Sequence, residues 1–256
     1  MGEYKLYIQT VYIPRENILF LDEWMNHHKN LGVDEFWMYD NSGSTFKDFV
    51  GNLQVDGMDK YGNEVMNLTS HLSDNDILNL ETEIFKKYNA KKISWTPKSP
   101  SGEITYGQVE SIYHFKNEVS FGFCCFIDID EFIILNKFSN IKDYISNVYK
   151  EDYQGIVIKQ KKYASRWENP SNVLSINKTF NFDTTHWAPK VIANIEKITQ
   201  KNNTNIHTFI DKKIIDNELC YFKHFNHNIN GHNWLLSNYE YLDKNWIPKN
   251  FNDVWE

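Results

Sequence analysis

The chain of 256 residues has little of several features that define large classes of proteins. It has three cysteines, an odd number that cannot all pair, so a disulfide scaffold is not expected. No stretch approaches the roughly 20 consecutive apolar residues that a membrane-spanning helix needs. A concentrated basic region is also missing, because the lysines are spread along the chain and the net charge is −7. Nucleic acid is therefore not an expected partner.

The beginning of the chain lacks the basic start and apolar block of a secretion signal, and residues 1–13 instead alternate as in a β-strand. Internal repeats, low-complexity linkers and shifts in composition are missing as well. A chain of this length can bury most of its apolar surface without covalent cross-links. We therefore expect one domain over residues 1–256, located in the cytoplasm.

Hydrophobic spacing predicts the order of the first elements. Apolar residues recur at helical spacing over residues 17–31, and Gly32 follows where helices commonly end. A short strand over 35–39 then ends in a turn that begins at Asp40. A strand-helix-strand unit predicts a right-handed parallel sheet whose ligands lie beyond the carboxyl ends of the strands.

The later elements are less regular. We expect helices near residues 75–89, 106–118 and 139–149, strands at 92–95 and 155–163, and short strands with Asn-rich loops over 164–235.

The most informative segment is residues 121–135, where Asp128 and Asp130 interrupt an apolar run. An ionised carboxylate is costly to bury without a partner, so we expect the strand to leave the sheet there and present both acids. Alternate residues of an extended segment point to one side, where two carboxylates can share one divalent cation. Oxygen ligands favour magnesium or manganese over zinc. The alternative without a functional role is a solvated turn between two strands.

The three cysteines have a simpler interpretation. Cys124 and Cys125 are adjacent on the expected buried strand, with side chains on opposite faces, and Cys220 lies in an apolar stretch. Free cysteine is among the most buried residue types, so we expect reduced thiols in the core.

The Asp-x-Asp motif alone is also similar to the nucleophile loop of haloacid-dehalogenase-type phosphatases, whose first Asp is phosphorylated. Those loops usually lie near the start of the chain and carry Thr or Val four residues after that Asp. This chain has Phe132 there. The phosphatase is therefore an alternative enzyme class and not the first choice.

A longer series of motifs resembles the GT-A glycosyltransferases of the family 2-like and family 92-like type. It comprises RENILFLDEW at 15–24, His28, LGVDEF at 31–36, YDN at 39–41, Gln108 and FIDIDEF at 126–132. The resemblance covers residues 4–135 and continues more weakly to 227. The chain departs from the family at Glu16 and Asn17, which stand in the reverse order, and in the turn at 41–45, which lacks its usual Asp.

This resemblance implies an α/β protein with the GT-A (Rossmann-like) fold and a mostly parallel central sheet flanked by helices. Residues 1–135 would form the nucleotide-sugar-binding half, 136–235 the acceptor half and 236–256 a C-terminal tail. In similar enzymes the first strand and the turn at Asp40 hold the base and ribose, and the Asp-x-Asp motif grips the diphosphate through Mn²⁺ or Mg²⁺. The donor-binding residues expected on this basis are Tyr12, Arg15, Asp40, Asn41, Gln108, Asp128 and Lys190.

The same resemblance implies that a downstream histidine completes a metal site with Asp128 and Asp130. His224 is the first choice and His207 the alternative, while His227 and His232 are further candidates. Inverting transfer would also need a carboxylate base to deprotonate the acceptor hydroxyl, for which Asp183 and Glu168 are the candidates.

We therefore expect a metal-dependent glycosyltransferase that moves a hexose from a UDP-sugar to a hydroxyl of a surface glycan or lipid-linked glycan, with inversion. The abundance of Asn, Lys and Ile is typical of an AT-rich bacterial genome. Peripheral association with the inner face of the membrane would suit such an acceptor. The alternative outside catalysis is a nucleotide- or sugar-binding module that has lost turnover.

Overall fold

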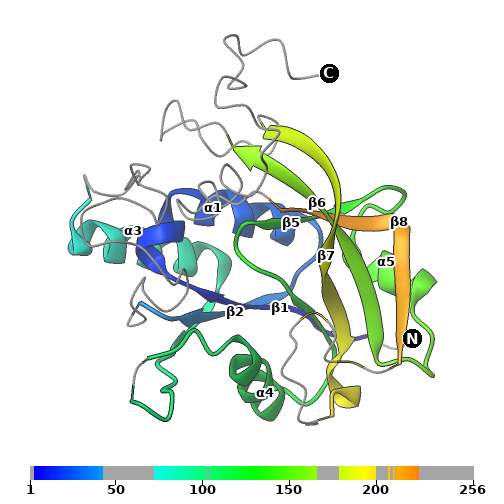
Figure 1. Ribbon diagram of the computed structural model, residues 1–256, viewed down its shortest axis with the longest axis horizontal. Helices are drawn as coiled ribbons and strands as arrows, with labels where there is room; N and C mark the ends of the chain where they lie inside the picture. Colours follow the sequence, from blue (N-terminus) through cyan, green and yellow to red (C-terminus); the bar gives the residue numbers. More distant parts are fainter. Residues whose placement is uncertain are drawn as a thin grey trace.

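A computed structural model describes residues 3–42, 72–102, 104–165, 179–199, 207, 210 and 212–224. Within them the chain forms an eight-stranded sheet with helices on both faces (Figure 1). The strands are β1 (Leu6–Tyr12), β2 (Glu35–Asp40), β3 (Lys91–Ser94), β4 (Phe123–Phe126), β5 (Glu131–Leu135), β6 (Gly155–Ser165), β7 (Thr179–Asn194) and β8 (Lys213–His224). The helices are α1 (Pro14–Asn30), α3 (Asp74–Tyr88), α4 (Gln108–Glu118) and α5 (Ile141–Val148), with a 3₁₀ turn at Ile195–Lys197.

The sheet has the order β3-β2-β1-β4-β7-β6-β8-β5. The first four strands of this order are parallel, so their carboxyl ends lie at one edge. The β6–β8 pair is parallel too, whereas β7 is antiparallel to β4 and β6, and β5 is antiparallel to β8. This confirms the expected α/β fold with a mostly parallel sheet.

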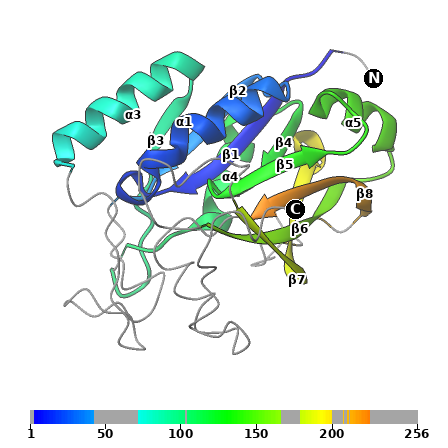
Figure 2. The same ribbon diagram turned by 90° about the horizontal axis from the view of Figure 1, so that it is seen from above.

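Each face of the sheet packs its own apolar core, because alternate residues of a strand point to opposite sides. Leu6 and Ile8 of β1 pack into one core with α1 and α3, whereas Tyr7 and Val11 pack into the other with α4. Figure 2 shows α3 lying alongside α1 on the first of these faces. Cys125 and Cys124 of β4 follow the same alternation, and both thiols are free and buried, as the sequence predicted.

Helix α1 is fastened to β5, the strand that follows the acidic motif. His28 is fully buried; its Nδ1 donates to the Trp24 carbonyl at 2.9 Å, and its Nε2 accepts the Ile133 N–H at 3.2 Å. Trp24 Nε1 donates to the Glu131 carbonyl at 2.8 Å. Burial lowers the pKa of His28 and keeps the imidazole neutral, as these contacts require. The residues around the acidic motif are thereby held by a helix on one core face.

The expected element positions hold closely in the first 160 residues and less well beyond. Helix α3 begins one residue before the expected 75–89 segment, and α1 begins three residues before the expected 17–31 segment. Residues 164–235 were expected to form short strands, yet β7 has 16 residues and β8 has 12. Both long strands pair with β6. Their length depends on this pairing, which the local sequence pattern does not predict. None of the helices in the described ranges is long and apolar enough to cross a membrane.

We predict that His28→Ala lowers the free energy of unfolding by about 2 to 4 kcal/mol, because it opens a cavity and leaves a buried N–H without its acceptor. Urea unfolding followed by tryptophan fluorescence measures this change. Leu78→Ala, at a 52% exposed position on α3, should change the same quantity by less than about 0.5 kcal/mol. Equal, small losses in both variants would show that His28 does not fasten α1 to β5.

Candidate active site

The acidic motif forms a tight turn where the chain leaves β4 and before it enters β5. The Glu131 N–H donates to the Asp128 carbonyl at 3.1 Å, and the Asp128 N–H donates to Glu131 Oε2 at 2.8 Å. The two strands on either side of the turn are separated in the sheet by β7, β6 and β8. The chain therefore leaves the sheet at the Asp-x-Asp motif, as the sequence predicted.

Two residues expected to bind the donor converge on the first acid of this motif. Gln108 Nε2 donates to Asp128 Oδ1 at 2.5 Å, and the Lys190 ammonium donates to Asp128 Oδ2 at 2.5 Å. Gln108 is the first residue of α4, after Gly107 at a φ of +57°. A Cβ at Gly107 would collide with the Pro97 ring, so glycine allows the helix to begin there.

Lys190 reaches the motif because β7 runs antiparallel to β4. The register pairs Phe126 with Val191, which places Lys190 beside the residues that follow β4. Its ammonium also lies 3.3 Å from Glu131 Oε2, and the whole residue is 3% exposed. Burial alone would lower the pKa of Lys190, but the charges of Asp128 and Glu131 outweigh it and raise the pKa, so the ammonium stays charged.

The second acid of the motif faces a histidine. His224 Nε2 lies 3.3 Å from Asp130 Oδ2, and His224 Nδ1 donates to Gln160 Oε1 at 2.8 Å. Because Nδ1 carries this proton, Nε2 and the carboxylate can face each other favourably only with a proton or a cation between them. Burial opposes a charged imidazole, but Asp130 and then Glu131 raise the pKa of His224.

Glu131 is the buried acid of the cluster, and it contacts both Lys190 and the Asp128 N–H. It is 1% exposed, and its Oε1 is a buried oxygen without a hydrogen-bond partner in the described part of the chain. Burial raises the pKa of Glu131 to about 8, against the opposing charge of Lys190. The cluster thus holds more acidic groups than its lysine can balance.

These observations test whether the residues suit a divalent cation. Asp130 and His224, two of the three expected ligands, lie 3.3 Å apart, a contact that a protonated imidazole or a cation between them makes favourable. The third, Asp128, has both oxygens bonded to Gln108 and Lys190. Accordingly, no group of three His, Cys, Asp or Glu side chains in the described ranges is arranged to hold a metal ion. The oxygen and nitrogen atoms of these side chains suit such an ion chemically, but in this arrangement only Asp130 and His224 lie together, while Asp128 is held by Gln108 and Lys190.

His207, the alternative ligand, lies near the same cluster. Its Nδ1 donates to the carbonyl of Pro189, the neighbour of Lys190, at 3.1 Å. Burial, and then the Lys190 charge, lower the pKa of His207, which favours the neutral imidazole that a metal ligand needs.

A second cluster of charges surrounds Asp40 at the same edge of the sheet. Asp40 Oδ1 accepts the Ser42 N–H at 2.9 Å, and Oδ2 lies 2.8 Å from the Lys92 ammonium. Lys92 also donates to Glu81 Oε2 at 2.5 Å, and Glu81 Oε1 accepts the Tyr12 hydroxyl at 2.5 Å. Sequence reasoning missed Glu81 and Lys92. A signal existed, because Glu81 lies between Ile77 and Phe85 on the buried face of α3.

The other residues expected to bind the donor make contacts within the protein. Tyr12 is 1% exposed and its hydroxyl donates to Glu81, which also accepts from Lys92, the partner of Asp40. The contact with the donor that is expected for Tyr12 stays a prediction. Arg15 pairs with Asp74. Asn41 Nδ2 donates to the Trp95 carbonyl at 2.8 Å and so ties the turn to the segment after β3.

The side chains of the two catalytic-base candidates and of two of the histidines lie outside the part of the chain that the structure describes. Asp183 belongs to β7, but its side chain is outside the described part. Glu168, His227 and His232 lie outside the described residues.

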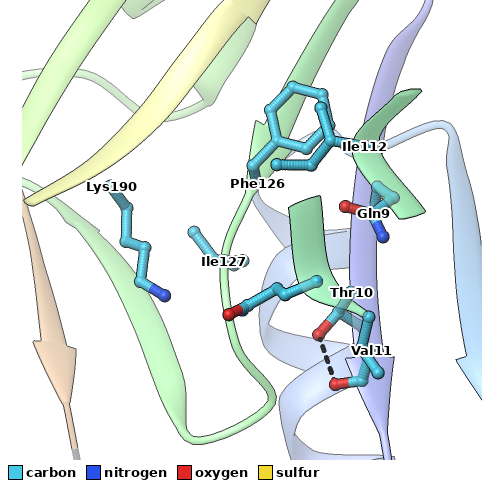
Figure 3. Close-up of a pocket in the computed structure, with 8 residues that line it drawn as sticks. Gln9, Thr10, Val11, Ile112, Phe126, Ile127 and Lys190 are labelled. Atoms are coloured by element: carbon cyan, nitrogen blue, oxygen red, sulfur yellow. Dashed lines mark hydrogen bonds between the residues drawn. The ribbon is translucent and has the colours of Figure 1, made fainter. Parts of the chain in front are cut away.

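A small pocket opens between β1, β4 and α4, next to the Asp-x-Asp turn. Figure 3 shows the ammonium end of Lys190 directed toward it from β7. The lining residues are Gln9, Thr10, Val11, Gln108, Ile112, Phe126, Ile127 and Lys190. The pocket therefore joins the carboxyl end of β1 to the residues that contact Asp128.

The sheet, its switch from parallel to antiparallel pairing and the acidic turn at its edge define a mixed α/β fold with a mostly parallel sheet, as expected for a GT-A protein. The family model described as glycosyltransferase family 92 matches residues 8–253, and the chain belongs to this family. The family is one of glycosyltransferases by its description. This membership favours glycosyl transfer over the phosphatase suggested by the Asp-x-Asp motif alone.

Among solved structures, the crystal structure of S. aureus TarS is similar to this chain with 12% identity and a TM-score of 0.42. The similarity covers 86% of this chain and 36% of the TarS chain, so this chain spans little more than a third of that protein. A similarity of this level does not bear on function. No curated protein matches the chain significantly.

We predict that Tyr12→Phe lowers the free energy of unfolding by about 1.5 to 3 kcal/mol, because the buried Glu81 carboxylate loses a hydrogen bond. Tyr4→Phe is the matched control, since that hydroxyl donates to the neutral carbonyl of Lys142 at 3.1 Å. It should cost only about 0.5 to 1.5 kcal/mol. Urea unfolding of both variants measures the difference, and a smaller loss for Tyr12→Phe than for Tyr4→Phe would contradict the buried charge network.

Proposed function

We propose that this glycosyltransferase binds a UDP-sugar along the carboxyl edge of its parallel strands and transfers the hexose to a hydroxyl of a surface glycan or lipid-linked glycan. The observation that carries the proposal is the convergence of Gln108 and Lys190 on Asp128, beside the Asp130–His224 pair. Ligands of open α/β sheets bind beyond the carboxyl ends of the strands, which is where this cluster lies.

The two clusters divide the donor between them. Asp40, held by Lys92 and the Ser42 N–H, would accept a hydrogen bond from the base or ribose. The Asp-x-Asp cluster would receive the diphosphate, with the Lys190 ammonium at the pocket beside the Asp-x-Asp turn. A nucleoside diphosphate offers both kinds of group in one molecule.

The reaction is proposed to depend on a divalent cation, Mn²⁺ or Mg²⁺. Asp130 and His224 would hold it, together with Asp128 or with His207 as an alternative ligand. The ion would supply positive charge as the departing nucleoside diphosphate becomes more negative. The residues of the chain itself position the diphosphate, through Gln108 and Lys190 at Asp128.

Inversion at the anomeric carbon is the proposed stereochemical outcome, with a carboxylate as the base that deprotonates the acceptor hydroxyl. Asp183 and Glu168 are the candidates for this base. Asp183 belongs to β7, the strand that also carries Lys190. We further propose that the enzyme acts in the cytoplasm, at the inner face of the membrane, where a lipid-linked acceptor would be presented.

We predict that UDP binds at least about 10-fold more weakly without Mn²⁺ than with it, and that His224→Ala removes most of this difference. Loss of even an indirect partner of a metal ligand typically costs 10- to 100-fold in metal affinity, so loss of a ligand should cost no less. Isothermal titration of UDP in both conditions measures the effect. UDP affinity that does not respond to Mn²⁺ in the unchanged protein would contradict the proposed metal dependence.

We also predict that Asp128→Asn abolishes the release of UDP from candidate UDP-hexoses in the presence of acceptor. Asp22→Asn removes one negative charge from an exposed ion pair with Lys87 on the surface and should leave release unchanged. A coupled assay for free UDP measures the rate, and circular dichroism confirms that both variants fold. Metal-dependent UDP binding without release from any donor would instead identify a binding module.

A further inference from the structure

Each oxygen of Asp128 accepts a hydrogen bond from a residue of a different element. Both of its oxygens accept hydrogen bonds at 2.5 Å, one from neutral Gln108 and the other from charged Lys190. The side chain of Asp128 is 28% exposed, so solvent and ligands can reach it, whereas the side chain of Lys190 is 4% exposed. A cation that approaches Asp128 from solvent therefore meets a carboxylate that already has a buried counter-ion.

The same ammonium serves a second carboxylate that lacks access to solvent. Lys190 lies 3.3 Å from Glu131 Oε2, and Glu131 is 1% exposed. Asp130 and His224 contact each other, and the ammonium contacts Asp128 and Glu131 instead. The cluster is thus divided into a half that the lysine serves and a half formed by Asp130 and His224.

We infer that Lys190 is a built-in counter-cation that competes with the divalent cation for Asp128 and that exchanges this carboxylate for the donor diphosphate when the donor binds. The inference rests on the proposed function and specifies the order of charge contacts within that site. Without the diphosphate, Lys190 holds Asp128 and the metal has only Asp130 and His224. With the diphosphate, the ammonium gains a new anionic partner and Asp128 becomes available.

The physical basis is that a buried ammonium must keep an anionic partner. A buried charge that loses its partner is strongly destabilising, so Lys190 cannot simply release Asp128 to a metal ion. The diphosphate is the natural replacement, because the ammonium faces the pocket beside the Asp-x-Asp turn (Figure 3). Metal and nucleotide should therefore assist each other's binding, and linkage requires this assistance to be equal in both directions.

Titration of the protein with Mn²⁺, followed by the electron paramagnetic resonance of the free ion, tests this inference in the presence and absence of UDP. In the unchanged protein, UDP should raise the affinity for Mn²⁺ at least about 10-fold, a coupling of about 1.4 kcal/mol. Lys190→Met should bind Mn²⁺ alone at least about 10-fold more tightly than the unchanged protein does, because Asp128 and Glu131 lose their counter-ion. The coupling between UDP and Mn²⁺ should shrink in this variant.

Two further variants keep the test decisive. Lys190→Gln retains a hydrogen-bond donor for Asp128 but loses the charge, and it should also bind Mn²⁺ more tightly if Lys190→Met fails to fold. Lys137→Met removes one positive charge at an exposed position and should leave the affinity for Mn²⁺ unchanged. Circular dichroism of each variant verifies folding.

Mn²⁺ affinity that is unchanged or weaker in folded Lys190→Met or Lys190→Gln overturns the inference. If UDP binding by the unchanged protein still depends on Mn²⁺ in that case, the proposed function stands and only the competition is wrong. If the unchanged protein binds UDP without any response to Mn²⁺, the metal dependence and the competition fail together. UDP release from UDP-hexoses then decides separately whether the donor assignment survives.

Discussion

The burial of acidic side chains at the end of β4 is the constraint on which the site depends. Glu131 is almost fully enclosed, and Asp130 beside it is 9% exposed. An isolated carboxylate in such surroundings is costly, so each one must have a partner. Lys190 serves Asp128 and Glu131, while His224 faces Asp130. The long strands β7 and β8 can be understood as the elements that carry these two partners to the turn.

The two charged clusters share one design. At the Asp-x-Asp turn, a lysine bridges the more exposed Asp128 and the buried Glu131, and a backbone N–H secures the glutamate. At β2, Lys92 bridges Asp40 and the buried Glu81, and the Tyr12 hydroxyl secures that glutamate. In both places the more exposed aspartate is fixed by a cation whose other contact is a buried glutamate. The UDP-sugar proposed above would offer a separate group to each of these two aspartates.

The features that could be predicted from the sequence are those that depend on residues close together in the chain. Asp128 and Asp130 could be located because acids inside an apolar run are unexpected, whatever the rest of the chain does. Helix α1 and strand β2 could be predicted because the spacing of their apolar residues is a local pattern, visible within each segment alone. The contact between Lys190 and Asp128 had no such signal, since 62 residues separate them and the register of β7 on β4 brings them together. Family resemblance assigned Lys190 to the donor but said nothing of its pairing with Asp128.

The two lysines differ in one property that affects how the clusters respond to their surroundings. The side chain of Lys92 is 36% exposed, so dissolved ions screen its contacts with Asp40 and Glu81. The side chain of Lys190 is 4% exposed, so its contacts with Asp128 and Glu131 are screened far less. The contacts of Lys92 should therefore depend more strongly on the salt concentration than those of Lys190. At the Asp-x-Asp end, any charge brought in must be matched by a rearrangement of the charges already enclosed there.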